Sequence, residues 1–239
     1  MDYLHRGQSN LPDAIWREID KAAAEAARDR LTGRRFLELQ GPFGAGIAGH
    51  LENGQPLDLT PAQDAAEAVA SREEEFVYRG QPDFRLPGLL THEGRQQLDG
   101  GDWAAVERAL GDVLAAVTQL DDAGYRGPYA LALAPPLYNG LFRLYPGTDV
   151  SQIQHLRHLC TRGIYKAPID GGVLVDPRVG ALVLGQDLRA GYIGQDGVHY
   201  QLYLTESIVL RIDEPRAICM ISATSSSLRA GITSTPTPS

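Results

Sequence analysis

The stretch VHYQLYLTESIVLRI, residues 198–212, alternates apolar and polar side chains along fifteen positions. A repeat of two residues is typical of a β-strand that buries one face. Strands in globular proteins usually run to about five or six residues, so this stretch predicts an unusually long strand, shared by a whole domain. Its apolar positions are Val198, Tyr200, Leu202, Leu204, Ile208, Leu210 and Ile212.

Glu206 is the one interruption, an acidic residue on the apolar face of the predicted strand. A buried carboxylate is costly unless it is paired. We therefore interpret Glu206 as a buried, paired structural carboxylate in preference to a catalytic acid.

Upstream, a first helix is expected to begin at Asn10 as the N-cap, with Pro12 in its first turn. Its apolar face comprises Ile15, Ile19, Ala22 and Ala26, widened by Trp16, and it ends near Thr32–Gly33. Residues 34–39 predict a short strand, which Gly41–Pro42 stops.

A second helix begins with Thr60–Pro61–Ala62–Gln63, which matches a capping box, and runs to about Tyr78. The three consecutive acids Glu73–Glu74–Glu75 are expected to be a solvated stretch. The Gly- and Pro-rich segment from Gly80 to Gly101 is predicted to be a connecting loop.

Asp102 is expected to cap the clearest helix, whose apolar residues recur with helical spacing from Trp103 to Leu120 and which ends at Gly124. Five further elements follow. We expect a strand at residues 129–133, a helical turn at 137–144, a helix at 151–161, and two more strands at 173–175 and 181–184. The Ser-, Thr- and Pro-rich end after Ser222 predicts a disordered tail.

Composition excludes several classes of protein. The net charge of −8 argues against a nucleic-acid partner, because phosphate binding depends on clustered cations. No apolar run approaches the roughly 20 residues of a membrane span, and Met1 to Asn10 lack the apolar core of a secretory signal. We therefore expect a cytoplasmic protein without a membrane partner, in which Cys160 and Cys219 are buried free thiols.

Candidate chemistry is sparse, so we predict no enzyme, no metal and no cofactor. Gly44–Gly49 matches G-x-G-x-x-G, but Asn53–Gly54 and Pro56 prevent the helix that a dinucleotide site needs. His155 and His158 share a helix without an evident third ligand. Cys160 and His158, two residues apart on that helix, point to different faces, and neither G-x-S-x-G nor S-x-x-K occurs.

Several short motifs, in order and spacing, resemble the encapsulin shell proteins, also called linocin-like proteins. The most specific are Leu184–Gly185–Gln186–Asp187–Leu188 with Gly191–Tyr192, and Leu204–Thr205–Glu206–Ser207. Others are Tyr3–Arg6, Gly33–Phe36, Gly41–Gly44, Glu73–Gly80, Gly88–Leu90 and Gly127–Leu131. The resemblance covers nearly the whole chain, to about Ser222.

This resemblance implies an α+β fold, the tailed-phage major capsid fold of the Hong Kong 97 type, with a spine helix, a peripheral domain and an axial domain. It divides the chain into five parts. Residues 1–50 hold the N-terminal arm, the first helix and the first strand, and residues 51–126 hold the spine helix and the rest of that peripheral region. Residues 127–192 form the axial domain, residues 193–222 the return strands of the peripheral domain, and residues 223–239 the tail. The family's extended loop, normally found between His50 and Leu51, is absent, and with it the region where some relatives hold a flavin.

By resemblance, identical subunits form an icosahedral shell that encloses cargo enzymes, such as peroxidases or ferritin-like proteins for iron storage, held by C-terminal targeting peptides. The expected peptide groove uses Ile19, Ala23, Leu31, Arg34, Glu38 and Ala190. The expected fivefold pore uses Thr161, Arg162, Gly163 and Ile164. Two alternatives stay open: a hydrolase or bacteriocin-like activity around Cys160 and His158, and a phage-capsid relict without cargo.

Overall fold

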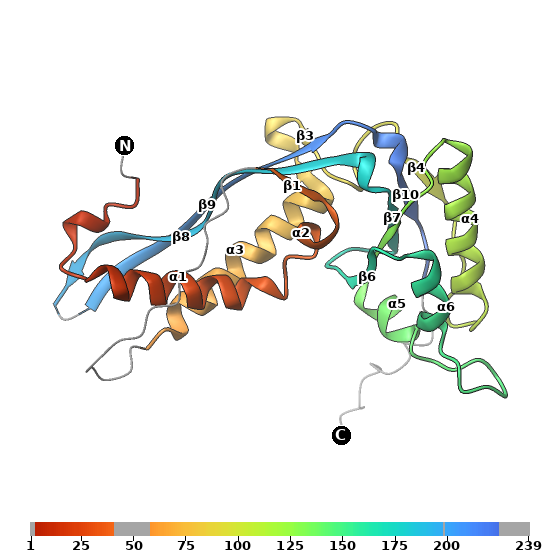
Figure 1. Cartoon of the computed structure of the whole chain (residues 1–239), viewed down its shortest axis with the longest axis horizontal. Helices are drawn as coiled ribbons and strands as arrows, with labels where there is room; N and C mark the ends of the chain where they lie inside the picture. Colours follow the sequence, from red (N-terminus) through yellow and green to blue (C-terminus); the bar gives the residue numbers. More distant parts are fainter. Residues whose placement is uncertain (1–2, 41–57, 198, 225–239) are drawn as a thin grey trace, which may run out of the picture. The chain divides into compact units, whose positions relative to one another are not determined.

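A computed structural model describes residues 3–40, 58–197 and 199–224. The chain divides into two compact units, the first formed by Met1–Val77 and Ala181–Arg211, the second by Tyr78–Gly180 and Ile212–Ser239. Each contains helices and a β-sheet, which confirms the α+β class (Figure 1). The finer assignment of residues 1–50, 51–126, 127–192 and 193–222 to peripheral and axial parts stays a prediction.

The first unit is built on two very long strands. β8 (Gly180–Asp196) and β9 (His199–Ile212) neighbour each other, and β1 (Glu38–Gln40) pairs in parallel with the start of β8, Glu38 opposite Ala181. The alternating stretch therefore forms the long strand that it predicts. Among the apolar residues of this stretch that the structure describes, however, most are half-buried, whereas Leu210 is buried and Tyr200 is exposed.

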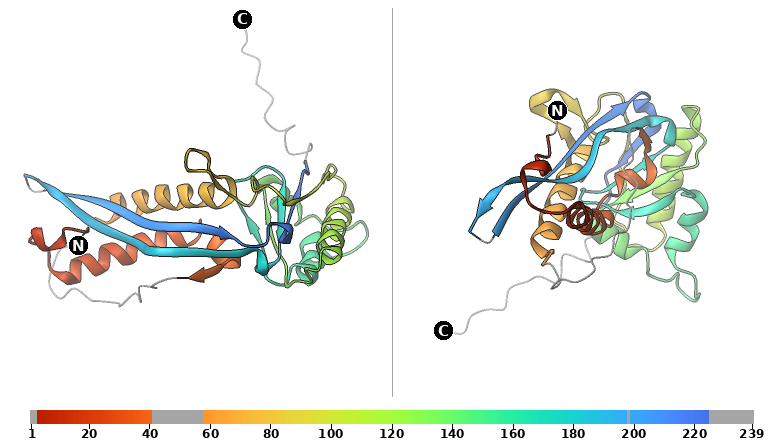
Figure 2. Two further views of the ribbon diagram at one scale, coloured as in Figure 1. Left: turned by 90° about the horizontal axis from the view of Figure 1, so that it is seen from above. Right: turned by 60° about the vertical axis from the view of Figure 1, so that its left-hand side comes forward.

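Two helices cover one face of this sheet, α1 (Asp13–Arg28) and α3 (Thr60–Arg79) (Figures 1 and 2). Small residues line their contact and let the backbones approach closely: Ala23 and Ala27 of α1 pack with Ala66, Ala70 and the strand residue Leu188. A second cluster, Trp16, Ile19 and Ala190, joins α1 to β8. The short helix η1 (Arg6–Gln8) precedes α1.

The helix starts differ from the expected ones. Pro12, which lacks an N–H, is the N-cap of α1, in place of Asn10. At the second helix Asp58 Oδ1 accepts the Thr60 N–H at 3.0 Å, and the Gln63 N–H bonds to the Leu59 carbonyl. Thr60 is therefore already the first residue of the helix, whereas the predicted capping box makes it the N-cap before the helix.

Two further expectations in this unit are wrong. Residues Gly33–Phe36 form a short helix, α2, so of the predicted strand 34–39 only Glu38 and Leu39 belong to a strand, β1. Glu73 and Glu74 are buried, and Glu75 alone is exposed. The acidic run is solvated at one position in three because α3 turns the other two carboxylates into the protein, where they find partners.

The second unit contains a mixed five-stranded sheet in the order β4-β10-β7-β5-β6. These strands are β4 (Gln96–Leu98), β5 (Ala130–Leu133), β6 (Gly163–Lys166), β7 (Gly172–Val175) and β10 (Ile218–Ile221). β5 pairs in parallel with β6 and antiparallel with β7, Ala130 lying opposite both Gly163 and Val175. The unit also contains α4 (Arg108–Asp122), α5 (Pro135–Gly140), α6 (Gln152–Leu159), η3 (Pro177–Val179) and η4 (Pro215–Ala217).

One apolar core holds this unit together. It joins Val113 and Leu120 of α4 to Leu131 of β5, Leu156 of α6 and Leu174 of β7. The Ser151–Gln154 capping box begins α6 where the sequence predicts a helix.

The main helix of the unit begins later than expected. α4 starts at Arg108, and Trp103 lies before it in a turn. The indole Nε1 of Trp103 donates to Asp112 Oδ2 at 2.9 Å, and the same oxygen accepts the Gly101 N–H. Trp103 is thus buried by folding back onto α4, although its spacing matches the helix.

The predicted loop Gly80–Gly101 is also more structured than expected, since it contains β2 (Gly80–Gln81), η2 (Pro82–Phe84), β3 (Leu86–Pro87) and β4. The predicted tail is ordered at its start, because the N–H of Trp103 donates to the carbonyl of Thr224 at 2.8 Å. The remainder of the tail, the Gly44–Gly49 motif and the expected loop junction at His50–Leu51 lie outside the described residues. No described helix combines the length and apolar character that crossing a membrane requires.

Candidate functional site

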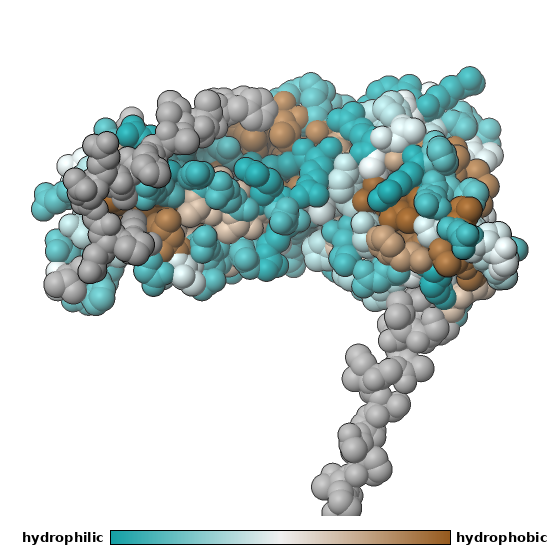
Figure 3. Space-filling view, turned by 60° about the horizontal axis from the view of Figure 1, so that its bottom comes forward, coloured by the Kyte–Doolittle hydropathy of each residue, from teal (hydrophilic) through white to brown (hydrophobic). Residues whose placement is uncertain are grey.

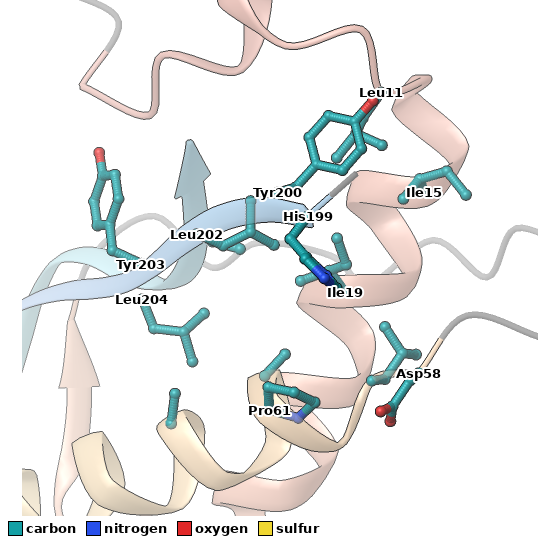
Figure 4. Close-up of a pocket in the computed structure, with 14 residues that line it drawn as sticks. Leu11, Ile15, Ile19, Asp58, Pro61, His199, Tyr200, Leu202, Tyr203 and Leu204 are labelled. Atoms are coloured by element: carbon teal, nitrogen blue, oxygen red, sulfur yellow. The ribbon is translucent and has the colours of Figure 1, made fainter. Parts of the chain in front are cut away.

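The first unit contains an apolar groove of about 640 Å³ between α1, the start of α3 and β9 (Figure 4). Ile15 and Ile19 of α1 form one wall, and Leu202 and Leu204 of β9 form another. Its polar lining includes Asp58 and His199. The lining residues are Leu11, Ile15, Ile19, Asp58, Leu59, Pro61, Ala62, Ala65, Ala190, His199, Tyr200, Leu202, Tyr203 and Leu204.

Two of the six residues expected to contact a peptide, Ile19 and Ala190, line this groove. The backbone of Ala190 is already in use: its N–H donates to Asp20 Oδ1 at 2.9 Å, and its carbonyl accepts from Nε and Nη2 of Arg6. Arg6 also pairs with Asp20 at 2.6 Å. A ligand at this point would contact side chains only, because the backbone N–H and carbonyl of Ala190 are already hydrogen-bonded to Asp20 and Arg6.

The other four expected contacts lie elsewhere in the unit. Ala23 and Leu31 belong to the buried cluster between α1 and α3. Arg34 is engaged in a cluster of carboxylates, and Glu38 is exposed at the start of β1.

Sequence reasoning missed most of the lining. The alternating pattern identifies Tyr200, Leu202 and Leu204 only as the apolar face of a strand. The alternation of apolar and polar residues in β9 does not show whether its apolar side chains line a groove or pack in the core.

Arg34 of α2 is the centre of a compact ionic cluster. Its Nε and Nη2 donate to the two carboxylate oxygens of Glu73 at 2.8 and 2.7 Å. Nη2 also donates to Glu206 Oε2 at 2.9 Å, and Nη1 donates to Asp187 Oδ1 at 2.7 Å. Glu206 is therefore paired, as predicted, and the guanidinium that pairs with it is shared by three acids.

Burial shapes the electrostatics of this cluster. It would lower the pKa of Arg34, but the hydrogen bonds and charges of Glu73 and Asp187 raise that pKa above its usual value. Burial and the charge of Glu73 raise the pKa of Glu206 to about 8, against the opposing effect of Arg34. Burial likewise raises the pKa of Glu74 to about 7, although the Thr32 hydroxyl and the Gly33 N–H donate to its carboxylate.

Of the four residues expected at a pore, Thr161 and Arg162 form the turn before β6, and Gly163 and Ile164 are the first two residues of that strand. Thr161 is exposed, and Arg162, Gly163 and Ile164 are half-buried. Gly163 has φ 118°, and a Cβ there would lie 2.5 Å from the Tyr165 hydroxyl oxygen. The fold of the single subunit therefore already requires glycine at position 163, whether or not copies of the chain meet there.

The candidates for chemistry are not arranged for it. Cys160 is 1% exposed, and burial raises its pKa to about 12, so its thiolate is disfavoured. His155 stacks edge-on against Tyr145, with ring centroids 5.2 Å apart. Within residues 3–40, 58–197 and 199–224, no group of three potential metal ligands comes together.

Apolar side chains are exposed in the second unit, on the segment between α5 and α6. Phe142 is 55% exposed and Leu144 is 53% exposed, and Val150 follows on the same segment. Figure 3 shows apolar residues gathered on the surface of this unit. Exposed apolar side chains that gather in this way mark contact sites more often than isolated ones do.

Solved structures show to which class this fold belongs. The virus-like particle from Pyrococcus furiosus superimposes with a TM-score of 0.68 over 87% of this chain and 99% of that chain, at 21% identity. The capsid of a native GTA particle gives 0.57 over 82% and 97%, at 12% identity, and that of Myoviridae phage XM1 gives 0.53. The chain has the tailed-phage capsid fold of the Hong Kong 97 type.

Sequence comparison identifies the family within this class. The family model described as "Encapsulating protein for peroxidase" (Linocin_M18) matches residues 1–55 and 48–209. A type 1 encapsulin shell protein of Myxococcus xanthus is 27% identical over 276 positions, covering 92% of this chain and 96% of that protein. One of Rhodospirillum rubrum is 31% identical, covering 84% and 74%. The chain belongs to this encapsulin family.

Proposed function

We propose that the chain is a structural subunit, not an enzyme, that assembles with copies of itself into the icosahedral shell of a cytoplasmic nanocompartment. The observation that carries this proposal is the capsid fold in a chain that the encapsulin family model matches to residue 209. Closed shells require each subunit to present complementary surfaces to several copies. The exposed Phe142, Leu144 and Val150 supply apolar surface for such contacts.

The groove between α1 and β9 is the proposed docking site for the C-terminal peptide of a cargo enzyme. Its apolar walls suit alternate apolar side chains of an extended peptide, and Ile19 and Ala190 belong to it. A peroxidase is the first candidate cargo, because the family description names it. A ferritin-like iron-storage protein is the second.

The turn Thr161–Ile164 is the proposed lining of a fivefold pore in an axial domain of residues 127–192. The support is the exposure of Thr161 and the partial exposure of its neighbours in the isolated chain. In the shell these residues would face their own copies around the axis.

We also propose that the family's extended loop is missing near His50–Leu51. The family model matches in two segments that meet at residues 48–55. The alignment with the Myxococcus protein runs over 276 positions, more than the 239 residues of this chain, so it must place gaps in this chain. A shell without that loop depends more heavily on its remaining subunit contacts.

The two alternatives differ in what supports them. A hydrolase or bacteriocin-like activity at Cys160 is disfavoured by the burial of the thiol and by its raised pKa. A phage-capsid relict would assemble in the same way but would hold no cargo. Cargo retention therefore separates the relict from the proposed function.

A co-expression experiment tests cargo docking. A bacterial peroxidase is produced with the chain, either with its natural C-terminal tail or without it, and particles are isolated by sedimentation. We predict that peroxidase activity sediments with the particles only when the tail is present. Particles that retain neither form would overturn the docking proposal and favour the relict.

A matched pair of variants tests whether the cargo peptide binds in this groove. Ala65 lines the groove and is exposed, and Ala68 is exposed on the same helix outside the lining. The bulky side chain of Ala65→Trp should fill the groove and release the peroxidase, whereas Ala68→Trp should retain it. Equal retention by both variants would exclude this groove.

A further inference from the structure

We propose that the carboxyl group of Glu206 on β9 holds a proton at neutral pH, beside Glu73 of α3, and that the loss of this proton in mildly alkaline solution weakens the attachment of β9 to α3. This inference concerns the fold of the first unit alone. Neither shell assembly nor cargo enters it.

Glu73 and Glu206 depend on the same nitrogen of one guanidinium. Both accept hydrogen bonds from Arg34 Nη2, at 2.7 and 2.9 Å, so their carboxyl groups lie close together. The side chain of Glu73 is 0% exposed and that of Glu206 is 11% exposed, so water screens the repulsion between two negative charges there poorly. A buried carboxyl group beside a second acid on one cation ionises less readily than an ordinary one.

Glu206 accepts fewer hydrogen bonds from Arg34 than Glu73 does. The charged and titratable groups that act on Glu206 are Arg34 from α2, Glu73 from α3 and Asp187 from β8, and Glu74 lies beside Glu73. Glu73 takes the bidentate contact with Arg34. Asp187 receives Nη1 and the Leu188 N–H, and Glu74 receives the Thr32 hydroxyl and the Gly33 N–H. Glu206 accepts from Nη2 at 2.9 Å, a nitrogen that already donates to Glu73.

The direction of the pH effect follows from the raised pKa of Glu206, about 8 against an ordinary 4.5. Between these two values the folded chain holds a proton that the unfolded chain has released. The stabilisation is complete below the unfolded pKa and is lost as the pH rises through the folded one. One such proton changes the ratio of folded to unfolded chain by about tenfold per pH unit in this window.

Urea unfolding of the purified full-length chain at several pH values, from pH 6 to pH 9, tests the inference. Glu206→Gln keeps a neutral group that donates to Glu73 without a titrating proton. We expect the folded-to-unfolded ratio of the wild type, relative to this variant, to fall about tenfold per pH unit up to about pH 8 and then to level off.

Glu75→Gln is the matched control, because Glu75 is exposed on the same helix. It makes the same change of charge outside the cluster and should follow the wild type at every pH. Parallel curves for wild type and Glu206→Gln would overturn the inference. The inference would also be overturned if Glu75→Gln reduced the pH dependence of the folded-to-unfolded ratio as much as Glu206→Gln does. The effect would then come from the net charge.

A second measurement needs only the wild type and applies if Glu206→Gln does not fold. Infrared spectroscopy follows the band of protonated carboxyl groups from pH 6 to pH 9. We expect it to disappear in two steps, one near pH 7 from Glu74 and one near pH 8 from Glu206. Complete loss of the band by pH 7 would contradict a proton held by Glu206.

Discussion

Arg34 shows how one residue organises several elements of the first unit. Its guanidinium reaches carboxylates on α3, β8 and β9 at 2.7–2.9 Å. The planar fork that binds both oxygens of Glu73 is specific to arginine, because an ammonium group is a point charge without that geometry. The site therefore depends on the shape of the cation as well as on its charge.

A conservative substitution of this residue measures the contribution of shape. Arg34→Lys should lower the free energy of unfolding by about 1–3 kcal/mol, because hydrogen bonds to buried carboxylates are lost. Arg35→Lys is the control, since Arg35 is exposed and pairs with Asp29 at the surface, where such pairs contribute little. Urea unfolding at pH 7 gives both values, and equal losses would remove the special role of Arg34.

At this scale the sequence predicts the state of one acid and misses two others. Glu206 is expected to be buried and paired, because it interrupts an apolar row. Glu73 and Glu74 resemble a surface run, because three consecutive acids are usually solvated. Their partners Thr32, Gly33 and Arg34 lie about forty positions away in the chain, a separation that no local pattern reveals.

Among the elements, α4 contains a glycine that can be improved. Gly111 lies inside the helix, and a Cβ there would meet no atom within 4 Å. Gly111→Ala should stabilise the second unit by about 0.5–1 kcal/mol, because alanine loses less backbone freedom on folding. Thermal or urea unfolding measures the change.

Gly163→Ala provides the contrast, because that glycine has a positive φ and its Cβ would clash with Tyr165. It should destabilise the fold by about 1–3 kcal/mol. A neutral effect at Gly163 would mean that the turn entering β6 is not held as the structure shows.

Elements with a long regular period are predicted well, and short ones are not. The alternation of β9 and the helical spacing of α4 extend over more than ten residues and survive local exceptions. β4 and β10 have only three and four residues, too few for a period to emerge. The helical spacing of Trp103 predicts a start of α4 at Asp102, although the side chain of Trp103 instead folds back to Asp112.

On the scale of the whole molecule, the exposed apolar segment between α5 and α6 is expected to be covered by a neighbouring copy. Phe142→Glu should prevent particle formation, because a charge buried without a partner costs several kcal/mol at each contact. Phe142→Leu is the matched control and should still assemble.

Circular dichroism of both variants must show the fold of the wild type, since Phe142 is 55% exposed in the single chain. Particles of normal yield from Phe142→Glu would show that this segment does not lie at a subunit contact. Electron microscopy of the two preparations gives the comparison directly.

The family could be recognised from short motifs, whereas the groove could not be delimited. Motifs such as Leu184–Leu188 keep their order and spacing whatever surrounds them. A groove depends on which half-buried side chains face one another, and Ile19 meets Leu202 and Leu204 only after β9 has been placed along α1 and α3.

The molar mass of the purified chain in solution tests the central claim most directly. Light scattering coupled to size-exclusion chromatography distinguishes a shell from a single subunit of 25.9 kDa. We predict one dominant species of many subunits, with closed particles in micrographs of the same fraction. A uniform species of 25.9 kDa at all concentrations would contradict the account.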